Sequence, residues 1–378
     1  MRHARTAARI LSAILLCVAL ATCGEPEPLR VGFAGPLEGR FSDLGVQGRN
    51  GLTMALEDIN AAGGVLGRPL LLLARDDGPT PETAQAAVLD LAKEGVAAIV
   101  GPMTSVQTLA ALPVAEEAGV PLLSPTTSTP LLSGKKDGFF RVIPASTTWA
   151  RAMARYCLEQ DGLRAVVTIT DLDNEPYAAP YTAAFAERFT AGGGTVLADL
   201  RVHSSQAGDW EDAARQLRAL GAPAVHATTS ARDLAALARQ LRHQGQTLRI
   251  YSSMWACTSE LLQAGGKAAE GILFAVSHSA DTPRPEFQRF VARYRERFGW
   301  EPNFAAAFGY ECGLVLAAAL RGAGGDPARL PAALAGLTEL PGIVAPLRLD
   351  EFGDVQRPAF IVAVAGREFT TIATVAEP

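Results

Sequence analysis

The stretch Ala98–Pro130, AIVGPMTSVQTLAALPVAEEAGVPLLSPTTSTP, decides the fold because two strands in it are each followed by a polar loop. The apolar run 97–100 is typical of a buried parallel strand, and Gly101–Pro102 ends it. Thr104 or Ser105 can cap the helix that follows. The apolar positions of that helix are Val106, Leu109, Ala110 and Val114. A second short strand over 121–123 leads into a loop crowded with hydroxyl side chains: Ser124, Thr126, Thr127, Ser128 and Thr129.

These two hydroxyl-rich loops are expected at the carboxyl ends of neighbouring strands, the edge of an open α/β sheet where small ligands bind. A helix N-terminus with free N–H groups beside hydroxyls suits an anion such as a carboxylate. Ordinary capping and turn formation would account for either loop alone. Together the two loops favour a small-anion site.

Strands and helices alternate on both sides of this stretch, which predicts parallel sheets covered on both faces. We expect two similar α/β lobes with more than one crossing between them, and 144–147 has the composition of a hinge. The expected strands are 29–34, 69–75, 97–100, 121–123, 139–143, 165–170, 195–200, 224–228, 248–252 and 272–276, and the expected helices include 48–61, 149–159, 177–191, 210–220, 233–243, 285–298 and 305–320. The tail segments 347–350 and 359–364 are predicted to pair as a hairpin.

Composition restricts the class of protein. The chain of 378 residues is 48% hydrophobic and 19% charged, with a net charge of −5, as in a soluble globular protein with a large core. No basic stripe interleaved with aromatic residues is present, so nucleic acid is not an expected partner.

Residues 1–22 are predicted to be a signal peptide, with three arginines before the apolar run 10–21. Removing them leaves a net charge of −8, because they carry Arg2, Arg5 and Arg9 and no acid. Leu20–Cys23 resembles a bacterial lipobox, which makes Cys23 the predicted site of lipidation and 23–28 a short tether. Simple cleavage after Ala21 is the alternative. No later apolar segment has the length of about 18 residues that spanning a membrane requires.

The sequence lacks the common catalytic, nucleotide-binding and metal-binding motifs. The pairs Asp76/Asp77 and Asp171/Asp173 are interpreted as turn residues. No cofactor, metal or enzymatic activity is therefore predicted. Cys157, Cys257 and Cys312 are far apart in the chain, and they are either buried thiols or include one bridged pair.

Several runs carry a family resemblance: VGFAGPLEGRFSDLG, INAAGGVLGR, IVGPMTS and AEEAGVPLLSPTTSTP. Across roughly 29–360 the chain resembles the leucine/isoleucine/valine-binding proteins of bacterial ABC transporters. The resemblance implies a type I periplasmic binding fold, in which two Rossmann-like α/β lobes are joined by a three-stranded hinge and clamp a ligand. Lobe 1 would comprise 29–145 plus 276–345, and lobe 2 would comprise 146–275 plus 346–378.

The resemblance also implies ligand-binding positions. Ser105 would meet a ligand carboxylate, and Leu44 stands where an aromatic side chain usually covers the ligand. The other implied positions are Thr126, Thr127 and Ser128 in lobe 1 and Tyr177, Ser230 and Met254 in lobe 2. The cysteine pair of some members is missing, because Gly78 and Thr104 stand near those positions.

Met254 departs from the family pattern, because an acidic residue usually stands there and pairs with the α-ammonium of the ligand. Burying a charge without its partner costs roughly 2–5 kcal/mol. Either the ligand lacks an α-ammonium, or Asp173 or Glu175 supplies the carboxylate. Met254 and Trp255 would otherwise form a soft apolar wall.

The expected function is therefore capture of a small carboxylate or amino-acid-like ligand for an ABC importer. The expected partners are an ABC permease and the membrane, through a lipid on Cys23, at a periplasmic or cell-surface location. An extracytoplasmic sensing subunit that signals through a separate membrane protein is the alternative, and a hydrolase on this scaffold is a third possibility.

Overall fold

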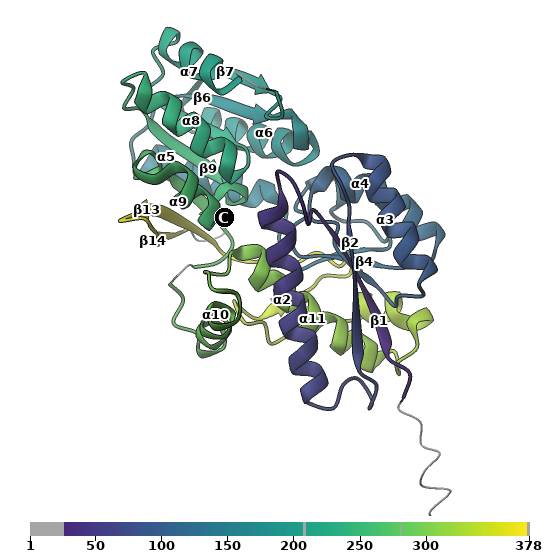
Figure 1. Ribbon diagram of the computed structural model, residues 1–378. Coiled ribbons are helices and arrows are strands. Elements are labelled where there is room, and N and C mark those ends of the chain that lie inside the picture. The colour runs from purple at the N-terminus through teal and green to yellow at the C-terminus, as the bar shows by residue number, and fades with distance from the viewer. Residues whose placement is uncertain (1–25, 207–208, 280, 376–378) are drawn as a thin grey trace, which may run out of the picture.

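The computed structural model describes residues 26–206, 209–279 and 281–375, which form two lobes side by side (Figure 1). The first lobe is built on a five-stranded parallel sheet with the order β2-β1-β3-β4-β5. Its strands are β1 (Leu29–Gly35), β2 (Leu70–Asp76), β3 (Ile99–Val100), β4 (Leu122–Ser124) and β5 (Phe139–Arg141). The predicted alternation of strands and helices in this half is confirmed.

The second lobe is built on a seven-stranded sheet with the order β14-β13-β10-β9-β8-β6-β7. The five strands from β10 to β7 are parallel, whereas β13 runs antiparallel to β10 and β14 antiparallel to β13. The strands are β6 (Ala165–Asp171), β7 (Thr195–Val202), β8 (Ala224–Thr228), β9 (Arg249–Ser253), β10 (Leu273–Val276), β13 (Ala359–Ala365) and β14 (Glu368–Val375). A separate two-stranded ladder pairs β11 (Glu339–Leu340) with β12 (Leu347–Arg348).

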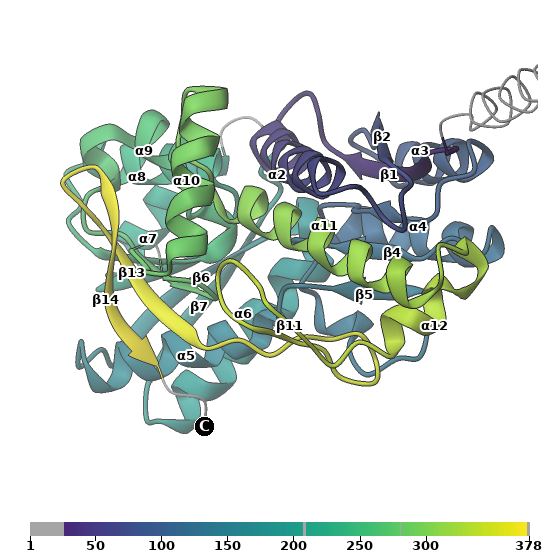
Figure 2. The same cartoon turned by 90° about the horizontal axis from the view of Figure 1, so that it is seen from below.

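Helices cover both sheets. In the first lobe α2 packs along α11, and α3 packs against α4 (Figures 1 and 2). In the second lobe α5 contacts α6, and α8 contacts both α7 and α9. The α-helices are α2 (Ser42–Ala61), α3 (Pro81–Lys93), α4 (Ser105–Glu117), α5 (Ser146–Glu159), α6 (Glu175–Ala191), α7 (Asp209–Ala219), α8 (Ala231–His243), α9 (Ser259–Gly265), α10 (Pro285–Phe298), α11 (Phe304–Gly322) and α12 (Leu330–Ala335). The 3₁₀ helices are η1 (Pro130–Leu132), η2 (Leu172–Asn174), η3 (Met254–Ala256), η4 (Gly266–Ala269) and η5 (Pro327–Arg329).

Among the described residues, α11 is the helix long and apolar enough to cross a membrane by length and composition, but most of it is buried inside the first lobe. It packs against α2 at glycine contacts. A Cβ on Gly51 would lie 1.9 Å from the carbonyl oxygen of Ala306, and one on Gly309 would lie 2.3 Å from that of Gly48. Such close backbone approach requires glycine. We therefore interpret α11 as a core helix.

Three segments cross between the lobes: 142–145, the stretch between β10 and α11, and 349–358. The third crossing is anchored by a buried ion pair between Arg357 and Glu311 of α11, and the Arg357 Nε–H also donates to the Val142 carbonyl (3.0 Å). The crossings hold the carboxyl ends of the parallel strands of both sheets toward each other.

Two expectations about local structure are wrong. The segments 347–350 and 359–364 do not pair, because β12 pairs with β11 and β13 pairs with β14. Period-two alternation identifies a strand but does not choose its partner. The turn between β13 and β14 instead contains Gly366 and Arg367, both at positive φ.

The buried face of α4 also differs from the expectation. Val106, Leu109, Ala110 and Val114 are only half-buried, whereas Thr108, Ala111, Leu112 and Ala115 face the interior. Polar residues at the start of this helix are buried together with the loop after β4, so apolar spacing does not mark the inner face here.

Candidate ligand-binding site

A small cavity lies between the lobes, at loops that follow the carboxyl ends of strands in both sheets. It encloses about 20 Å³, room for roughly one water molecule. Its walls are formed by Leu44, Met103, Thr104, Ser105, Thr126, Ser128, Ile143, Trp149, Asn174, Tyr177, Met254, Trp255 and Phe304. Ligand sites of small molecules usually enclose about 300–1,000 Å³. The lobes are therefore in a closed arrangement, and a ligand with a side chain enters only when they separate.

The structure brings six of the eight ligand positions implied by the resemblance to this cavity: Leu44, Ser105, Thr126, Ser128, Tyr177 and Met254. Thr127 and Ser230 do not line it. The Thr127 hydroxyl lies 2.7 Å from that of Thr108, and the Ser230 hydroxyl donates to the Asp233 carboxylate. These two hydroxyls brace the loops around the cavity.

The first-lobe wall is a pair of loops tied together by hydroxyl groups. The Ser124 hydroxyl donates to the Pro102 carbonyl (2.9 Å), and the Thr126 hydroxyl donates to the Met103 carbonyl (2.5 Å). Because these bonds run from the loop after β4 to the loop after β3, the wall is fixed before any ligand arrives. Thr126 thus lines the cavity while its hydroxyl hydrogen holds the two loops together.

The N-terminus of α4 points into this wall. Thr104 is the N-cap, and its hydroxyl accepts from the Gln107 N–H (3.5 Å). The next free donor, the Val106 N–H, reaches across to the Asn174 side-chain oxygen of the second lobe (3.3 Å). An amide oxygen thus lies where the helix N-terminus attracts negative charge. A ligand carboxylate could replace it beside Ser105.

The second-lobe wall is aromatic. Tyr177 and Trp255 meet edge to face with ring centroids 5.5 Å apart, and Phe41 of the first lobe lies 5.5 Å from Trp255. The Tyr177 hydroxyl and the Trp149 indole N–H are buried, and neither has a hydrogen-bond partner of good geometry among the described residues. Leaving a buried donor unpaired costs about 1–3 kcal/mol. Both groups are therefore donors available to a ligand acceptor.

Burial also raises the pKa of the Tyr177 hydroxyl, more than the nearby Ser253 side chain and Trp255 backbone lower it. The hydroxyl therefore keeps its proton at neutral pH and can act as a donor. Met254 also lines the cavity and offers a flexible thioether beside this wall.

No side chain that lines the cavity is charged. Asp173, one of the two alternative acids, lies outside it and accepts from the Ser205 N–H at 2.6 Å. Glu175, the other, pairs with Arg201 at 2.7 Å. The structure therefore offers a ligand hydroxyls, amide groups and indole or phenol donors, but no carboxylate for an ammonium group.

An ion pair clasps the two lobes beside the cavity. Arg40, in the loop after β1, pairs with Asp233 of α8 at 2.5 Å and lies 3.5 Å from Asp173. The Trp210 indole N–H (3.2 Å) and the Ser230 hydroxyl also donate to Asp233. Because Arg40 belongs to the first lobe and its partners to the second, this clasp favours the closed arrangement.

The described cysteines, Cys157, Cys257 and Cys312, are free and buried, and burial raises the pKa of each thiol. A disulfide among them is therefore not formed. Cys23 and the rest of residues 1–25 lie outside the described residues. Among the residues that the structure describes, no group of three or more His, Cys, Asp or Glu side chains could hold a metal ion.

Sequence reasoning missed several residues that line the cavity. Trp149 was expected only as the start of a helix, and Asn174 and Phe304 were not singled out. A polar residue just after a strand, as Asn174 is after β6, was the one available signal. The position of Phe304 depends on the crossing between β10 and α11, which no local pattern specifies.

The arrangement of two α/β lobes, three crossings and a cavity between them defines a bilobed ligand-binding protein. A family model described as periplasmic binding protein matches residues 28–368, and the chain belongs to this family of solute-binding proteins, which act outside the cytoplasm. The Leu/Ile/Val-binding proteins are among its relatives.

Individual relatives cover most of the chain. An amino acid binding protein of Pseudomonas aeruginosa is 29% identical over 306 residues, covering 79% of this chain and 80% of its own. Leu/Ile/Val-binding protein homolog 3 of Brucella melitensis is 26% identical over 341 residues, covering 88% of this chain and 90% of its own. The crystal structure of a leucine binding protein from Thermotoga maritima superposes with a TM-score of 0.83 at 27% identity, covering 92% of this chain and 98% of that one.

Proposed function

We propose that this protein captures a small carboxylate that lacks an α-ammonium group and delivers it to an ABC importer. The observation that carries the proposal is the uncharged lining of the cavity, with Met254 and no acidic residue in its second-lobe wall. The relatives named above are called amino acid and leucine binding proteins. The proposed ligand is therefore similar in size to those amino acids but lacks their positively charged ammonium group.

The first-lobe wall suits the carboxylate. The ligand would accept hydrogen bonds from the Ser105 and Ser128 hydroxyls and from the N-terminus of α4, now occupied by the Asn174 oxygen. Charge-assisted hydrogen bonds contribute roughly 1.5–3 kcal/mol each. A helix N-terminus adds roughly 0.3–1 kcal/mol for an anion.

The second-lobe wall suits an apolar body. Trp255 and Met254 offer aromatic and thioether surface, and Tyr177 adds a donor at its edge. An ammonium group closed into this wall would lose its hydration without gaining a carboxylate partner. At roughly 2–5 kcal/mol, that loss corresponds to tens-fold to thousands-fold in affinity.

The test is a thermal-shift and calorimetric screen of matched pairs, in which each amino acid is compared with the same molecule without its amino group. Leucine is paired with 4-methylpentanoate and phenylalanine with 3-phenylpropanoate. We expect the amino-free member of at least one pair to bind at least about tenfold more tightly. Tighter binding of the amino acid in every pair would contradict the proposed ligand class.

Import and anchoring are separate parts of the proposal. Deleting the gene should abolish uptake of the radiolabelled acid that binds best, and uptake that persists would contradict an import role. Lipid on Cys23 is tested by metabolic labelling with a fatty acid, which should mark the wild-type chain and not Cys23→Ala. Equal labelling of both chains would rule out that site.

A further inference from the structure

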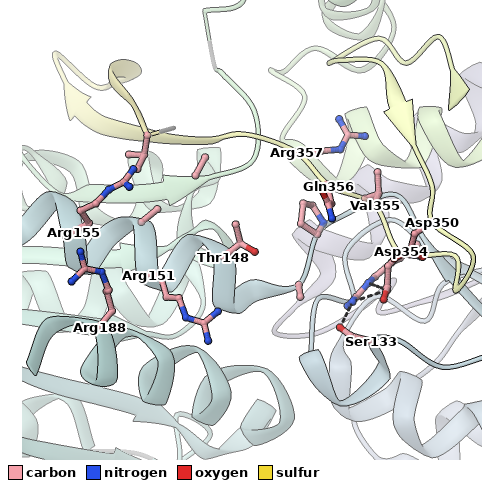
Figure 3. Close-up of a pocket in the computed structure, with 16 residues that line it drawn as sticks. Ser133, Thr148, Arg151, Arg155, Arg188, Asp350, Asp354, Val355, Gln356 and Arg357 are labelled. Carbon is pink, nitrogen blue, oxygen red and sulfur yellow. Dashed lines mark hydrogen bonds and ion pairs between the residues drawn. The ribbon is translucent and has the colours of Figure 1, made fainter. Parts of the chain in front are cut away.

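A second, larger hollow lies against the hinge, and we call it the hinge groove (Figure 3). It encloses about 470 Å³, within the range of small-molecule sites. Its walls are formed by α5 and α6 of the second lobe, the crossings 142–145 and 349–358, the loop after η1, and the ends of β5, β13 and β14. It shares no lining residue with the cavity between the lobes.

The hinge groove and the cavity lie on different sides of the same elements. In the first crossing Ile143 lines the cavity, whereas Pro144 and Ala145 line the groove. On α5, Trp149 lines the cavity, whereas residues 148, 151, 152 and 155, which share one helix face, line the groove. A rotation about the crossings that opens the cavity therefore narrows the groove.

The charged side chains on the second-lobe wall of the groove are all arginines, whereas the other wall carries both signs, with Arg141 and Arg357 beside its two acids. Figure 3 shows Arg151, Arg155 and Arg188 on the second-lobe side and Asp350 and Asp354 on the other. Arg151 and Arg155 come from α5 and Arg188 from α6, and all three line the groove.

The two acids of the groove, Asp350 and Asp354, already have partners on their own side of the groove. Asp354 pairs with the buried Arg141 at 2.7 Å, and its other oxygen accepts from the Gly134 N–H at 2.9 Å. Asp350 accepts from the Phe352 and Asp354 N–H groups.

Arg151 and Arg188 on the second-lobe wall are less fully neutralised than these acids. Arg188 has a carboxylate oxygen of Glu159 only at 3.9 Å, and Arg151 is exposed. The second-lobe wall therefore keeps positive charge. Guanidinium groups bind carboxylates and phosphates through paired N–H donors.

We propose that the hinge groove is a second ligand site, which takes a small multivalent anion on Arg151 and Arg188 and thereby stabilises the closed arrangement. An occupant of the groove resists the rotation that narrows it. Because the cavity opens by that same rotation, the anion and the cavity ligand favour each other's binding by the same factor. The chemistry required is two or more carboxylate or phosphate groups on a compact molecule.

Binding is tested with citrate and pyrophosphate as probes, by calorimetry on the full mature chain at constant ionic strength. We expect at least one probe to bind, and Arg151→Ala/Arg188→Ala to weaken that binding about tenfold, since each exposed ionic contact contributes up to about 1 kcal/mol. The matched control is Arg218→Ala/Arg242→Ala, which removes the same charge from exposed positions on α7 and α8. Tighter binding of citrate would indicate a polycarboxylate, and of pyrophosphate a phosphate compound.

Two results would overturn the site: no binding of either probe, or equal weakening by the groove variant and the control. Coupling to closure is measured by small-angle scattering with no cavity ligand present, so it stands apart from the proposed carboxylate. The bound probe should reduce the radius of gyration of the wild-type chain and leave that of the groove variant unchanged. An unchanged radius in the wild type at saturation would overturn the coupling.

Discussion

The two walls of the cavity differ in how they are built. The first-lobe wall is polar and internally bonded, with Ser124 and Thr126 tying the loops after β3 and β4 together. The second-lobe wall is aromatic, and the Tyr177 hydroxyl within it has no hydrogen-bond partner of good geometry among the described residues. We therefore expect the first wall to bind the carboxylate group of a ligand, and the second wall to select among molecules that carry one.

The largest effect on affinity is expected from the first-lobe wall. Ser105→Ala/Ser128→Ala removes two hydroxyl donors, roughly 3–6 kcal/mol together if each contributes as a charge-assisted bond. Calorimetry with 4-methylpentanoate should show at least about a hundredfold loss. Thr190→Ala is the control, because its hydroxyl bonds to the backbone of its own helix at the surface. Equal affinity of the wild type, the double variant and the control would show that these hydroxyls do not bind the ligand.

A smaller effect is expected from the second-lobe wall. Tyr177→Phe removes a donor that is buried without a partner, so the free protein should unfold at the same or a higher temperature. Affinity for 4-methylpentanoate should nevertheless fall by about ten- to a hundredfold, if this hydroxyl donates to the ligand. Loss of stability together with unchanged affinity would show that Tyr177 only supports the fold.

The clasp between the walls should contribute less again. Arg40→Ala breaks the contacts with Asp233 and Asp173, and because Arg40 is partly exposed we expect about 1 kcal/mol or less, up to about fivefold in affinity. Arg201→Ala is the control, since its ion pair with Glu175 stays within the second lobe. A similar loss in both variants would mean that the clasp does not act through closure.

The turn behind the first-lobe wall should affect ligand affinity least, and its expected effect is on stability. Burial, with Asp76 nearby, raises the pKa of Asp77 to about 8, and its neighbour Gly78 accepts from the Gln107 side chain of α4 (3.1 Å). Between the unfolded pKa of about 4 and this value the folded chain holds a proton that the unfolded chain has lost. Stability from this group is therefore greatest at low pH and falls as pH rises toward 8.

Asp77→Asn should remove that contribution. The free energy of unfolding of this variant minus that of the wild type should increase between pH 5 and pH 8, by at most about 1.4 kcal/mol per pH unit. Urea denaturation at each pH measures this difference. A difference that stays constant across this range would contradict a raised pKa at Asp77.

The first-lobe wall was the more predictable half of the site. Short apolar runs ending in Gly-Pro and Ser-Pro located β3, β4 and the loops after them, and Thr104 capped α4 as a polar residue before a helix does. These signals are local, so a single sequence contains them. The buried face of α4 was predicted wrongly, because the residues at the beginning of this helix are buried although they are polar.

The second-lobe wall depends on distant segments. Trp149, Asn174 and Phe304 reach the cavity from elements far apart in the chain, and the pairing of β13 with β14 was missed for the same reason. Of the second-lobe positions implied by the resemblance, Tyr177 and Met254 line the cavity, whereas Ser230 does not and its hydroxyl bonds to Asp233. The sequence alone could not show that the cavity lining is uncharged or that Asp173 is bonded elsewhere, because both depend on how the two lobes pack together.

The most direct test of the account is the ratio of the dissociation constants of leucine and 4-methylpentanoate, measured by calorimetry for wild type, Met254→Glu and Met254→Gln. We expect a ratio well above one in the wild type, and a fall of at least about tenfold in Met254→Glu, because the new carboxylate pairs with the ammonium group and is left unpaired by the amino-free acid. Met254→Gln, which has the same shape without the charge, should change the ratio little. A wild-type ratio below one, or an equal fall in both variants, would contradict the claim that the missing acid in the second-lobe wall selects the ligand.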